Sequence, residues 1–541
     1  MSDVTTVPGR SLVEVGDLTV DFGDLRAVDG LTFRLERGAA LALVGESGSG
    51  KSTVASALLG LHRGTGTRVG GSIDVAGTDV QEASDEELQR LRGGRAAMVF
   101  QDPLSSLDPY YAIGDQIAEV YRVHARASRR AARARAVEVL DRVGIPDAAR
   151  RSRSRPHEFS GGMRQRALIA MALACEPDLL IADEPTTALD VTVQAQILDL
   201  LHTLREETGM GLLLVTHDVG VAAESVDEVL VMRHGRAVEQ GPVAEVLGAP
   251  ARTYTRELLG AVPRVDAPRE VRAAETVGEV VLEATGLRRE FGRGKRAFTA
   301  VDDVSLTIHR GETLGIVGES GSGKTTLGRM LVGLLEPTAG EVRYDGHARV
   351  DVDPAVQMVF QDPVSSLNPR RTVGESIADP LRARGERDEG RIRGRVRELL
   401  ERVGLEAAHY DRYPHEFSGG QRQRVGIARA LAADPRIIVC DEPVSALDVT
   451  TQAQVVALLG ELQRELGLAL VFVAHDLAVV RQVSDRVAVM RRGRIVEEGP
   501  ADEVYDNPQD PYTKQLLAAV PVLDPRIAAQ RRAARRELAA V

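Results

Sequence analysis

One phosphate-binding motif occurs twice in this chain of 541 residues. The string VGESGSGK runs from residue 44 to 51 and again from 317 to 324, followed by Ser52 and Thr325. Both copies fit G-x-x-x-x-G-K-[ST], in which backbone N–H groups and a helix N-terminus surround phosphate oxygens. Only four of the 68 basic residues are lysine, and Lys51 and Lys324 are two of them. The predicted nucleotide-binding residues are Gly45, Ser47, Gly48, Gly50, Lys51, Ser52 and Thr53 in the first copy and Gly318, Ser320, Gly321, Gly323, Lys324, Thr325 and Thr326 in the second.

Further strings repeat in the same order behind each motif, so a whole domain is duplicated. A repeat unit this long indicates tandem domains and not a solenoid. The polar, Pro-containing segment between the copies is typical of a linker. The predicted organisation is a first domain with its tail at 1–262, a linker at 263–280 and a second domain with its tail at 281–541. The repeated strings are FQDP at 100–103 and 360–363, HEFSGG at 157–162 and 415–420, DEP at 183–185 and 441–443, ALDVT at 188–192 and 446–450, and HD at 217–218 and 475–476.

Short apolar runs alternate with helix-like segments in each copy. Runs at 178–185, 210–218 and 313–318 read as buried strands that end in Gly or polar residues. Such alternation predicts a parallel sheet covered by helices. We therefore expect two tandem α/β P-loop NTPase domains, each with a mostly parallel sheet core. A polar stretch at 82–95 predicts an additional helix in the first copy.

Acids and histidines follow the apolar runs at matching places in both copies. Asp183 and Asp441 are suited to contact Mg²⁺, and Glu184 and Glu442 are candidate general bases for an attacking water. His217 and His475 follow the next strand. An Asp-Glu pair or a single His at a strand end is often only structural. Recurrence beside both phosphate motifs favours the catalytic interpretation.

The complete pattern resembles the ATP-binding cassette (ABC) ATPases, because FSGGM at 159–163 and FSGGQ at 417–421 match that family's signature. The resemblance implies an antiparallel β part and a helical subdomain in each domain, in addition to the parallel sheet core. It also implies that the signature of one domain binds the γ phosphate of ATP held by the other. Met163 replaces the usual Gln, and no loss of competence is expected. The residues to which the resemblance gives roles are Ser160, Gly161, Gly162, Ser418, Gly419 and Gly420 in the signatures, Gln101 and Gln361 as Mg²⁺-sensing glutamines, Asp190 and Asp448 as D-loop acids, His217 and His475 as switch histidines, and Phe22 and Phe291 against adenine, with Phe298 close to the latter.

By the same resemblance the two domains should form a head-to-tail intramolecular sandwich with two hydrolytic sites, which use ATP and Mg²⁺. Neither copy lacks a catalytic element. The first site would combine Lys51, Ser52, Gln101, Asp183, Glu184 and His217 with Ser418, Gly419 and Gly420, and the second would combine Lys324, Thr325, Gln361, Asp441, Glu442 and His475 with Ser160, Gly161 and Gly162.

Segments outside the catalytic motifs resemble the oligopeptide, dipeptide and nickel import branch of that family. They are 100–119 with 360–379, and the tails RTYTRELLGAVP at 252–263 and DPYTKQLLAAVP at 510–521. The resemblance implies two integral-membrane permease subunits, an extracytoplasmic substrate-binding protein, and a peripheral position on the cytoplasmic face of the cell membrane. Some members carry a cysteine cluster in the tail, and this chain does not. We expect no zinc or iron–sulfur centre. The sequence leaves dipeptide, longer peptide, glutathione-like and nickel-chelate cargo open.

Composition limits the other classes of function. A net charge of −11 and a pI near 5.6 argue against nucleic acid as a partner. Two cysteines cannot build a disulfide framework, and no apolar run is long enough for a membrane span. The alternative is a soluble tandem cassette protein acting on ribosomes, but such proteins carry a long charged linker. The Arg-rich stretch 122–155 is predicted to be a solvated helix face or a surface for anionic lipid, and 526–541 a frayed helix.

Overall fold

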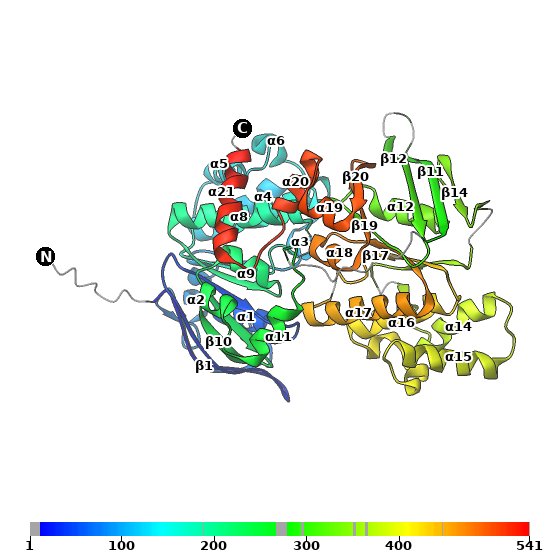
Figure 1. Ribbon diagram of the computed structural model, residues 1–541. Helices are drawn as coiled ribbons and strands as arrows, with labels where there is room; N and C mark the ends of the chain where they lie inside the picture. The colour runs from blue at the N-terminus through cyan, green and yellow to red at the C-terminus, as the bar shows by residue number, and fades with distance from the viewer. Residues whose placement is uncertain are drawn as a thin grey trace. The chain divides into compact units, whose positions relative to one another are not determined.

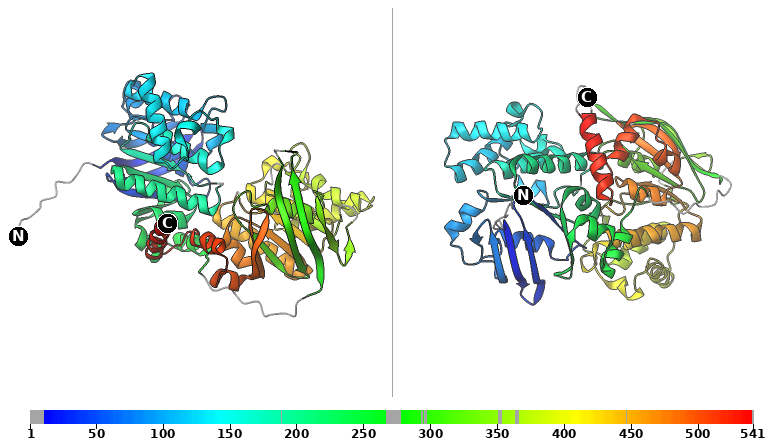
Figure 2. Two further views of the ribbon diagram at one scale, coloured as in Figure 1. Left: turned by 90° about the horizontal axis from the view of Figure 1, so that it is seen from above. Right: turned by 60° about the vertical axis from the view of Figure 1, so that its left-hand side comes forward.

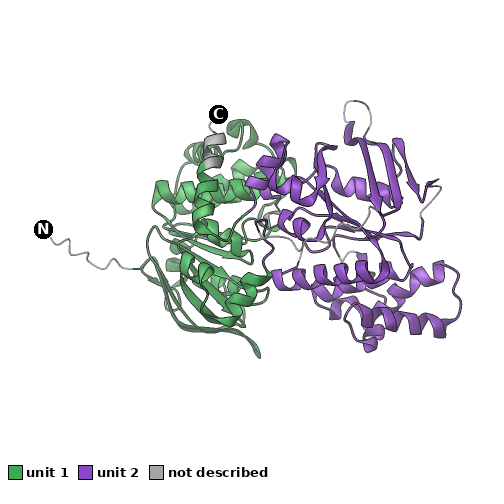
Figure 3. Cartoon of the chain, in the orientation of Figure 1, with its two compact units in different colours: residues 1–189, 193–261, 521–541 green, residues 190–192, 262–520 purple. Residues whose placement is uncertain are grey.

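The computed structural model divides the chain into two compact units (Figure 3). Unit 1 comprises Met1–Leu189, Val193–Ala261 and Pro521–Val541, and unit 2 comprises Asp190–Thr192 and Val262–Val520. The residues described are 11–187, 189–266, 278–292, 294, 297–349, 353–362, 366–445 and 447–539, so most of the predicted linker lies outside them.

A six-stranded sheet forms the core of unit 1, in the order β10-β9-β3-β8-β7-β6. Strands β6, β7, β8, β3 and β9 pair in parallel, and β10 runs antiparallel to β9. The three central strands are buried along their whole length, which explains their unbroken apolar sequences. The strands are β3 (Ala40–Val44), β6 (Ala96–Val99), β7 (Leu179–Asp183), β8 (Gly211–Thr216), β9 (Glu228–Arg233) and β10 (Arg236–Pro242).

A second, antiparallel sheet of unit 1 has the order β2-β1-β4-β5 (Figure 2). Its strands alternate buried and exposed residues, as expected for a sheet with one face on the core. Helix α1 (Lys51–Leu58) packs between this sheet and the parallel one, within one aliphatic core. The strands are β1 (Val13–Phe22), β2 (Leu25–Leu35), β4 (Arg68–Val75) and β5 (Thr78–Asp79).

The remaining helices of unit 1 include the helical part that follows β6 (Figure 1). The predicted helix within 82–95 is present and begins at a capping box of Ser84 and Glu87. The helices are α2 (Asp85–Leu91), α3 (Pro103–Ser106), α4 (Ile113–Ala125), α5 (Arg129–Arg142), α6 (Ala148–Arg151), η1 (Pro156–Glu158), α7 (Gly161–Leu173), α8 (Val191–Thr208), α9 (Val219–Ser225), α10 (Val243–Gly248), α11 (Thr253–Ala261) and α21 (Pro525–Ala539).

Unit 2 repeats this architecture, with sheet orders β16-β17-β18-β13-β19-β20 and β12-β11-β14-β15. The α/β fold predicted for both copies is therefore confirmed. The strands are β11 (Val280–Phe291), β12 (Phe298–His309), β13 (Thr313–Val317), β14 (Ala339–Tyr344), β15 (His347–Ala348), β16 (Val356–Val359), β17 (Ile437–Asp441), β18 (Ala469–Val473), β19 (Arg486–Arg491) and β20 (Arg494–Pro500). The helices are α12 (Lys324–Leu331), α14 (Val373–Ala383), α15 (Glu389–Arg402), η3 (Ala407–Asp411), η4 (Pro414–Glu416), α16 (Gly419–Leu431), α17 (Val449–Leu466), α18 (Leu477–Val483), α19 (Ala501–Asp506) and α20 (Pro511–Ala518).

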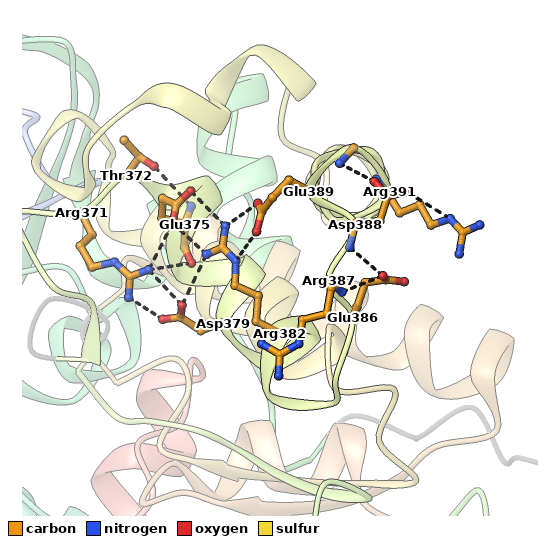
Figure 4. A network of polar contacts seen from close by, with 11 residues as sticks. Arg371, Thr372, Glu375, Asp379, Arg382, Glu386, Arg387, Asp388, Glu389 and Arg391 are labelled. Atoms are coloured by element: carbon orange, nitrogen blue, oxygen red, sulfur yellow. Dashed lines mark hydrogen bonds and ion pairs between the residues drawn. The ribbon is translucent and has the colours of Figure 1, made fainter.

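Ion pairs join α14 to α15 in the helical part of unit 2 (Figure 4). The Arg382 guanidinium lies between Glu375, at 2.9 Å, and Glu389, at 2.7 Å. Arg371 contacts Asp379 at 2.6 Å. The hydrogen bonds of Glu389 and Glu375 raise the pKa of Arg382, so this network keeps its charge at any working pH.

The last 21 residues differ from the prediction. The sequence placed 281–541 in the second domain and predicted a frayed helix at its end, whereas Pro521–Val541 belongs to unit 1. There α21 lies beside α9, Ala528 is fully buried, and Arg535 pairs with Asp199 of α8 (Figure 1). Burial and this ion pair hold the segment on unit 1.

No helix within the described ranges combines the length and the apolar character needed to cross a membrane.

Candidate functional site

Each phosphate motif forms a turn between a buried strand and a helix. In unit 1 the turn joins β3 to α1, and in unit 2 it joins β13 to α12. A Cβ atom on Gly45 would lie 2.2 Å from the Met232 carbonyl oxygen, and one on Gly318 would lie 2.2 Å from that of Met490. These distances exclude any side chain, so the glycines follow from the close approach of two backbones. Ser47, Gly48 and Gly50, with Ser320, Gly321 and Gly323, lie in the turns, and Thr53 and Thr326 lie in the first helical turns.

The two lysines lie against their own turns. Lys51 Nζ donates to the carbonyl oxygens of Gly45 and Glu46, each at 2.8 Å. Lys324 Nζ donates to those of Gly318 and Glu319, at 2.7 and 2.9 Å. Both side chains are buried, and burial lowers the pKa of Lys324. Each turn therefore places a buried ammonium group at the start of a helix, an arrangement that suits a polyphosphate.

A hydroxyl and a carboxylate meet next to each lysine. Ser52 Oγ donates to Asp183 Oδ1 at 3.0 Å, and Thr325 Oγ1 donates to Asp441 Oδ1 at 3.0 Å. Burial raises the pKa of both aspartates. These oxygen donors fit Mg²⁺, which binds one or two protein oxygens together with phosphate oxygens. Within the described ranges no three His, Cys, Asp or Glu side chains gather into a metal site of their own, so a metal here would depend on the nucleotide for its other ligands.

Glu184 is the meeting point of the predicted catalytic side chains in unit 1. Gln101 Nε2 donates to its Oε2 at 2.8 Å, and His217 Nδ1 lies 3.2 Å from its Oε1. Burial alone would raise the pKa of Glu184, but its hydrogen bond and ion pair with His217 outweigh burial and lower it. The same hydrogen bond raises the pKa of His217. The carboxylate is therefore ionised and can accept a proton from water.

Glu442 has nearly the same surroundings in unit 2. Gln361 Nε2 donates to Oε2 at 2.8 Å, and His475 Nδ1 lies 3.3 Å from the same oxygen. Burial opposes the shift, but the partnership with His475 lowers the pKa of Glu442 and raises that of His475. Glu184 and Glu442 also share a φ of 47°, a left-handed conformation that costs a side-chain-bearing residue energy and concentrates at functional sites.

The hydroxyl partner of the glutamate differs between the units. Thr187 Oγ1 donates to Glu184 Oε2 at 2.9 Å. The equivalent Ser445 donates to the backbone oxygen of Glu442 at 3.2 Å and so leaves the carboxylate with fewer donors. Thr187 was missed from the sequence, although a hydroxyl residue stands three positions after both glutamates.

The signature serines cap helices. Ser160 Oγ accepts from the Met163 N–H and starts α7, and Ser418 Oγ accepts from the Gln421 N–H and starts α16, each at 3.3 Å. Gln421 returns the bond by accepting from the Ser418 N–H, which Met163 cannot do. Gly161 and Gly162 begin α7, and Gly419 and Gly420 begin α16. The first N–H groups of a helix have no partner within the helix and favour an anion.

The predicted D-loop acids and adenine-stacking aromatics lie at element ends. Asp190 directly precedes α8 and accepts from the Thr192 hydroxyl at 2.7 Å, and Asp448 caps α17. Phe22 ends β1 and Phe291 ends β11, where Phe291 stacks on Phe298 at 5.6 Å. Phe22 is exposed and meets the His62 ring edge-on at 5.4 Å. Phe291 is partly buried, with the Arg289 guanidinium 4.9 Å from its ring centroid, whereas Phe298 is exposed.

One tail residue reaches the phosphate turn of unit 2 and was missed. The Tyr512 hydroxyl of α20 accepts from the Glu319 N–H at 3.0 Å, and Arg491 covers the Tyr512 ring. The repeated Tyr-Thr of both tails was the available signal, but it was assigned only to the branch resemblance.

Each unit therefore combines a P-loop motif with a neighbouring glutamate that contacts a Gln and a His. The chain belongs to the ABC transporter family, whose model matches residues 28–187 and 301–445, and it is an ATP-binding, ATP-hydrolysing protein. The model described as "Oligopeptide/dipeptide transporter, C-terminal region" matches 238–288 and 496–540. The predicted family and branch are thereby confirmed.

Its relatives resemble it along nearly the whole chain. It is 47% identical over 95% of its length to the glutathione import ATP-binding protein GsiA of Salmonella choleraesuis (strain SC-B67), covering 90% of that protein. It is 48% identical over 93% of its length to GsiA of Escherichia coli O6:H1, covering 87% of that protein. The solved ATP-binding cassette MJ0796, bound to ADP and Pi, aligns over 41% of this chain and 98% of its own, with 34% identity and a TM-score of 0.38.

Proposed function

We propose that this chain is the ATP-hydrolysing subunit of an importer of small peptides. The observation that carries the proposal is that each complete catalytic set is followed by a segment that matches the oligopeptide/dipeptide transporter model. In this role the chain would lie on the cytoplasmic face of the cell membrane and drive two permease subunits. An extracytoplasmic binding protein would deliver the cargo.

Glutathione is the first cargo to test, because the relatives that match over nine-tenths of this chain are named for its import. The alternative, a soluble tandem cassette protein on ribosomes, gains no support from the tail model or from these relatives. Cargo selection would rest with the binding protein and the permease, so the ATPase sites themselves carry no peptide specificity.

The mechanism follows from the residues at each site. Lys51 would hold the terminal phosphates, and Ser52 and Asp183 would hold Mg²⁺, which neutralises phosphate charge when bound. Glu184 would take a proton from the attacking water, because its pKa is lowered and Gln101 orients its carboxylate. Protonated His217 would counter the charge on the transferring phosphoryl group. The equivalent residues of unit 2 would act in the same way.

We further propose that the two units close head to tail. The signature N–H groups that begin at Ser418 would complete the site of Lys51, and those that begin at Ser160 would complete the site of Lys324. Two ATP molecules would stabilise the closed state, and hydrolysis would remove that bias. Coupling to the permease would use this cycle.

Purification from native membranes tests the proposal. The tagged chain should co-purify with two integral-membrane subunits, and vesicles containing that assembly should accumulate labelled glutathione or a labelled dipeptide when ATP is supplied on the cytoplasmic side. The matched control is the same assembly with Glu184→Gln and Glu442→Gln, which should bind ATP without uptake. Co-sedimentation with ribosomes and no association with membrane subunits would exclude the import proposal.

A further inference from the structure

In both copies of the repeat, the chain passes from one unit to the other within the same three-residue string. The string Ala-Val-Pro occupies 261–263 and 519–521. Unit 1 ends its main segment at Ala261, and Val262 begins unit 2; unit 2 ends at Val520, and Pro521 returns to unit 1 (Figure 3). Pro521–Val541 of the second copy therefore belongs to unit 1, and the segment that begins at Val262 and includes the predicted linker belongs to unit 2; these two segments are called the exchanged tails below.

In unit 1 the exchanged tail packs on α9. Pro521 lies against Gly220, where an added Cβ would be 3.0 Å from the proline ring. Arg532 donates to the Glu224 carbonyl oxygen. Arg535 contacts Asp199 of α8 at 3.1 Å and the Glu224 carboxylate at 3.5 Å. Pro521 and these two arginines tie the tail to α9, and Arg535 also ties it to α8.

In unit 2 the exchanged tail packs on α18. Val265 is buried in the same aliphatic core as Leu477 and Val480 of that helix. Arg481 of α18 donates to the Val265 carbonyl oxygen and pairs with Asp506 of α19 at 2.8 Å. The contacted helix is equivalent in the two units, although the contacting side chains differ.

The contacted helices begin directly after the switch histidines. Asp218 follows His217 and caps α9 by accepting from the Gly220 N–H at 2.8 Å, and Asp476 follows His475 and caps α18 in the same way. Any displacement of α9 therefore acts on the short segment that sets the distance from His217 to Glu184. Gly220 takes part in both contacts, the cap and the tail.

We propose that each exchanged tail is a positioning element for the switch histidine of the unit on which it packs, and that Arg535 is the positioning residue of unit 1. Through it, the end of the second copy would influence hydrolysis at the first site. The inference depends on ATP hydrolysis by this family member and is independent of the cargo.

The charges around Glu224 give this contact a pH dependence. Burial raises the pKa of Glu224 to about 7, while Arg535 and Arg532 of α21 oppose the rise. Asp199 of α8 and Asp218 at the start of α9 add to it. Removing Arg535 therefore moves the pKa of Glu224 further upward, and above that pKa the variant contains a buried carboxylate with less compensation.

Hydrogen exchange on the full chain tests the proposal without reference to turnover. Arg535→Gln should increase exchange several-fold in the peptide that spans 217–226 and leave the equivalent peptide 475–484 unchanged. Arg526→Gln is the matched control, because this substitution removes the same charge from an exposed position of the same helix. Unchanged exchange at 217–226 in Arg535→Gln would overturn the proposal. Melting temperatures of both variants would show whether the units remain folded.

The pH profile of ATP hydrolysis separates positioning from simple packing. Arg535→Gln should lower kcat several-fold at pH 8.5 with little change in KM for ATP, and acidification to pH 6.5 should restore most of the loss. Glu224→Gln in the same chain should restore kcat at pH 8.5, because no buried charge then needs a partner. A uniform loss at every pH, or no rescue by the second change, would contradict the role of Arg535. Failure of the import proposal would leave both readouts unaffected.

Discussion

His217 Nδ1 lies 3.2 Å from Glu184 Oε1, and each residue shifts the pKa of the other. The pair places a carboxylate with a lowered pKa and an imidazole with a raised pKa at the ends of neighbouring strands, β7 and β8. The carboxyl ends of parallel strands are where ligands bind in open α/β sheets. In the equivalent pair of unit 2, His475 Nδ1 lies 3.3 Å from Glu442 Oε2.

Glutamate-to-glutamine changes test whether both sites hydrolyse ATP. Glu184→Gln or Glu442→Gln should leave ATP binding intact and reduce turnover sharply, because the general base contributes on the order of 100-fold or more. Each variant should also accumulate in the closed, ATP-bound state, which would be visible as slowed nucleotide release. The measurements are steady-state ATPase activity and equilibrium binding of labelled ATP. Unchanged turnover in either single variant would show that only one site is competent.

Replacing both switch histidines should move the acidic limb of the pH–rate profile. In His217→Asn with His475→Asn, the hydrogen bonds and charges that lower the pKa of Glu184 and Glu442 are weakened, while burial still raises it. The carboxylates should therefore protonate at higher pH, and the remaining activity should begin to fall at a higher pH than in the parent. Turnover measured from pH 5 to pH 9 checks this. An acidic limb at the parental position would show that the histidines do not control the base.

Most of each site was predictable because it is held by local chain geometry. Gly45 and Lys51 lie at fixed places on one strand–turn–helix unit, so their spacing in sequence determines their spacing in the fold. Asp183 ends the separate strand β7 and contacts Ser52 of that unit. The same argument placed His217 beside Glu184, since adjacent parallel strands end at one edge. Repetition of every motif added a second, independent instance of each pattern.

Contacts between distant segments were not predictable from the sequence. Arg535 meets Asp199 across more than 300 residues of chain, and nothing in an Arg- and Ala-rich helix identifies its acidic partner. The few apolar residues of 526–541 predicted a frayed helix, yet burial of Ala528 and two ion pairs hold it in place. Tyr512 is a similar case, because its hydroxyl finds the backbone of Glu319 only in the folded unit.

The hydroxyl next to each lysine should determine the Mg²⁺ concentration that ATP hydrolysis requires. Ser52→Ala with Thr325→Val removes the groups that donate to Asp183 and Asp441, which the metal would share with the phosphates. Turnover should fall by at least about tenfold, and the Mg²⁺ concentration for half-maximal activity should rise. Chelation of Mg²⁺ should abolish activity in the parent. A parental Mg²⁺ titration in the double variant would refute this assignment.

Tyr512→Phe should loosen the phosphate turn of unit 2. The change removes the hydroxyl that accepts from the partly buried Glu319 N–H and leaves the ring, so about 1 kcal/mol of local stability should be lost. We expect a weaker affinity for ATP by up to about fivefold at one of two sites and little change in the rate of the bound complex. Binding titrations with labelled ATP check this. Tyr413→Phe, which removes an exposed hydroxyl, is the matched control and should bind as the parent does.

Arg382 offers a test of how much the ion pairs of the helical part contribute to its stability. Its guanidinium connects Glu375 of α14 with Glu389 of α15, but the pairs are partly exposed, so Arg382→Gln should cost only about 1 kcal/mol. The loss should appear as an earlier urea midpoint for unit 2 at low ionic strength, and it should shrink as salt screens the parental pairs. Arg391→Gln, which removes one exposed pair with Asp388 at 3.6 Å, should have a smaller effect. Equal losses in the two variants at every salt concentration would show that the bridging geometry of Arg382 adds nothing to a single surface pair.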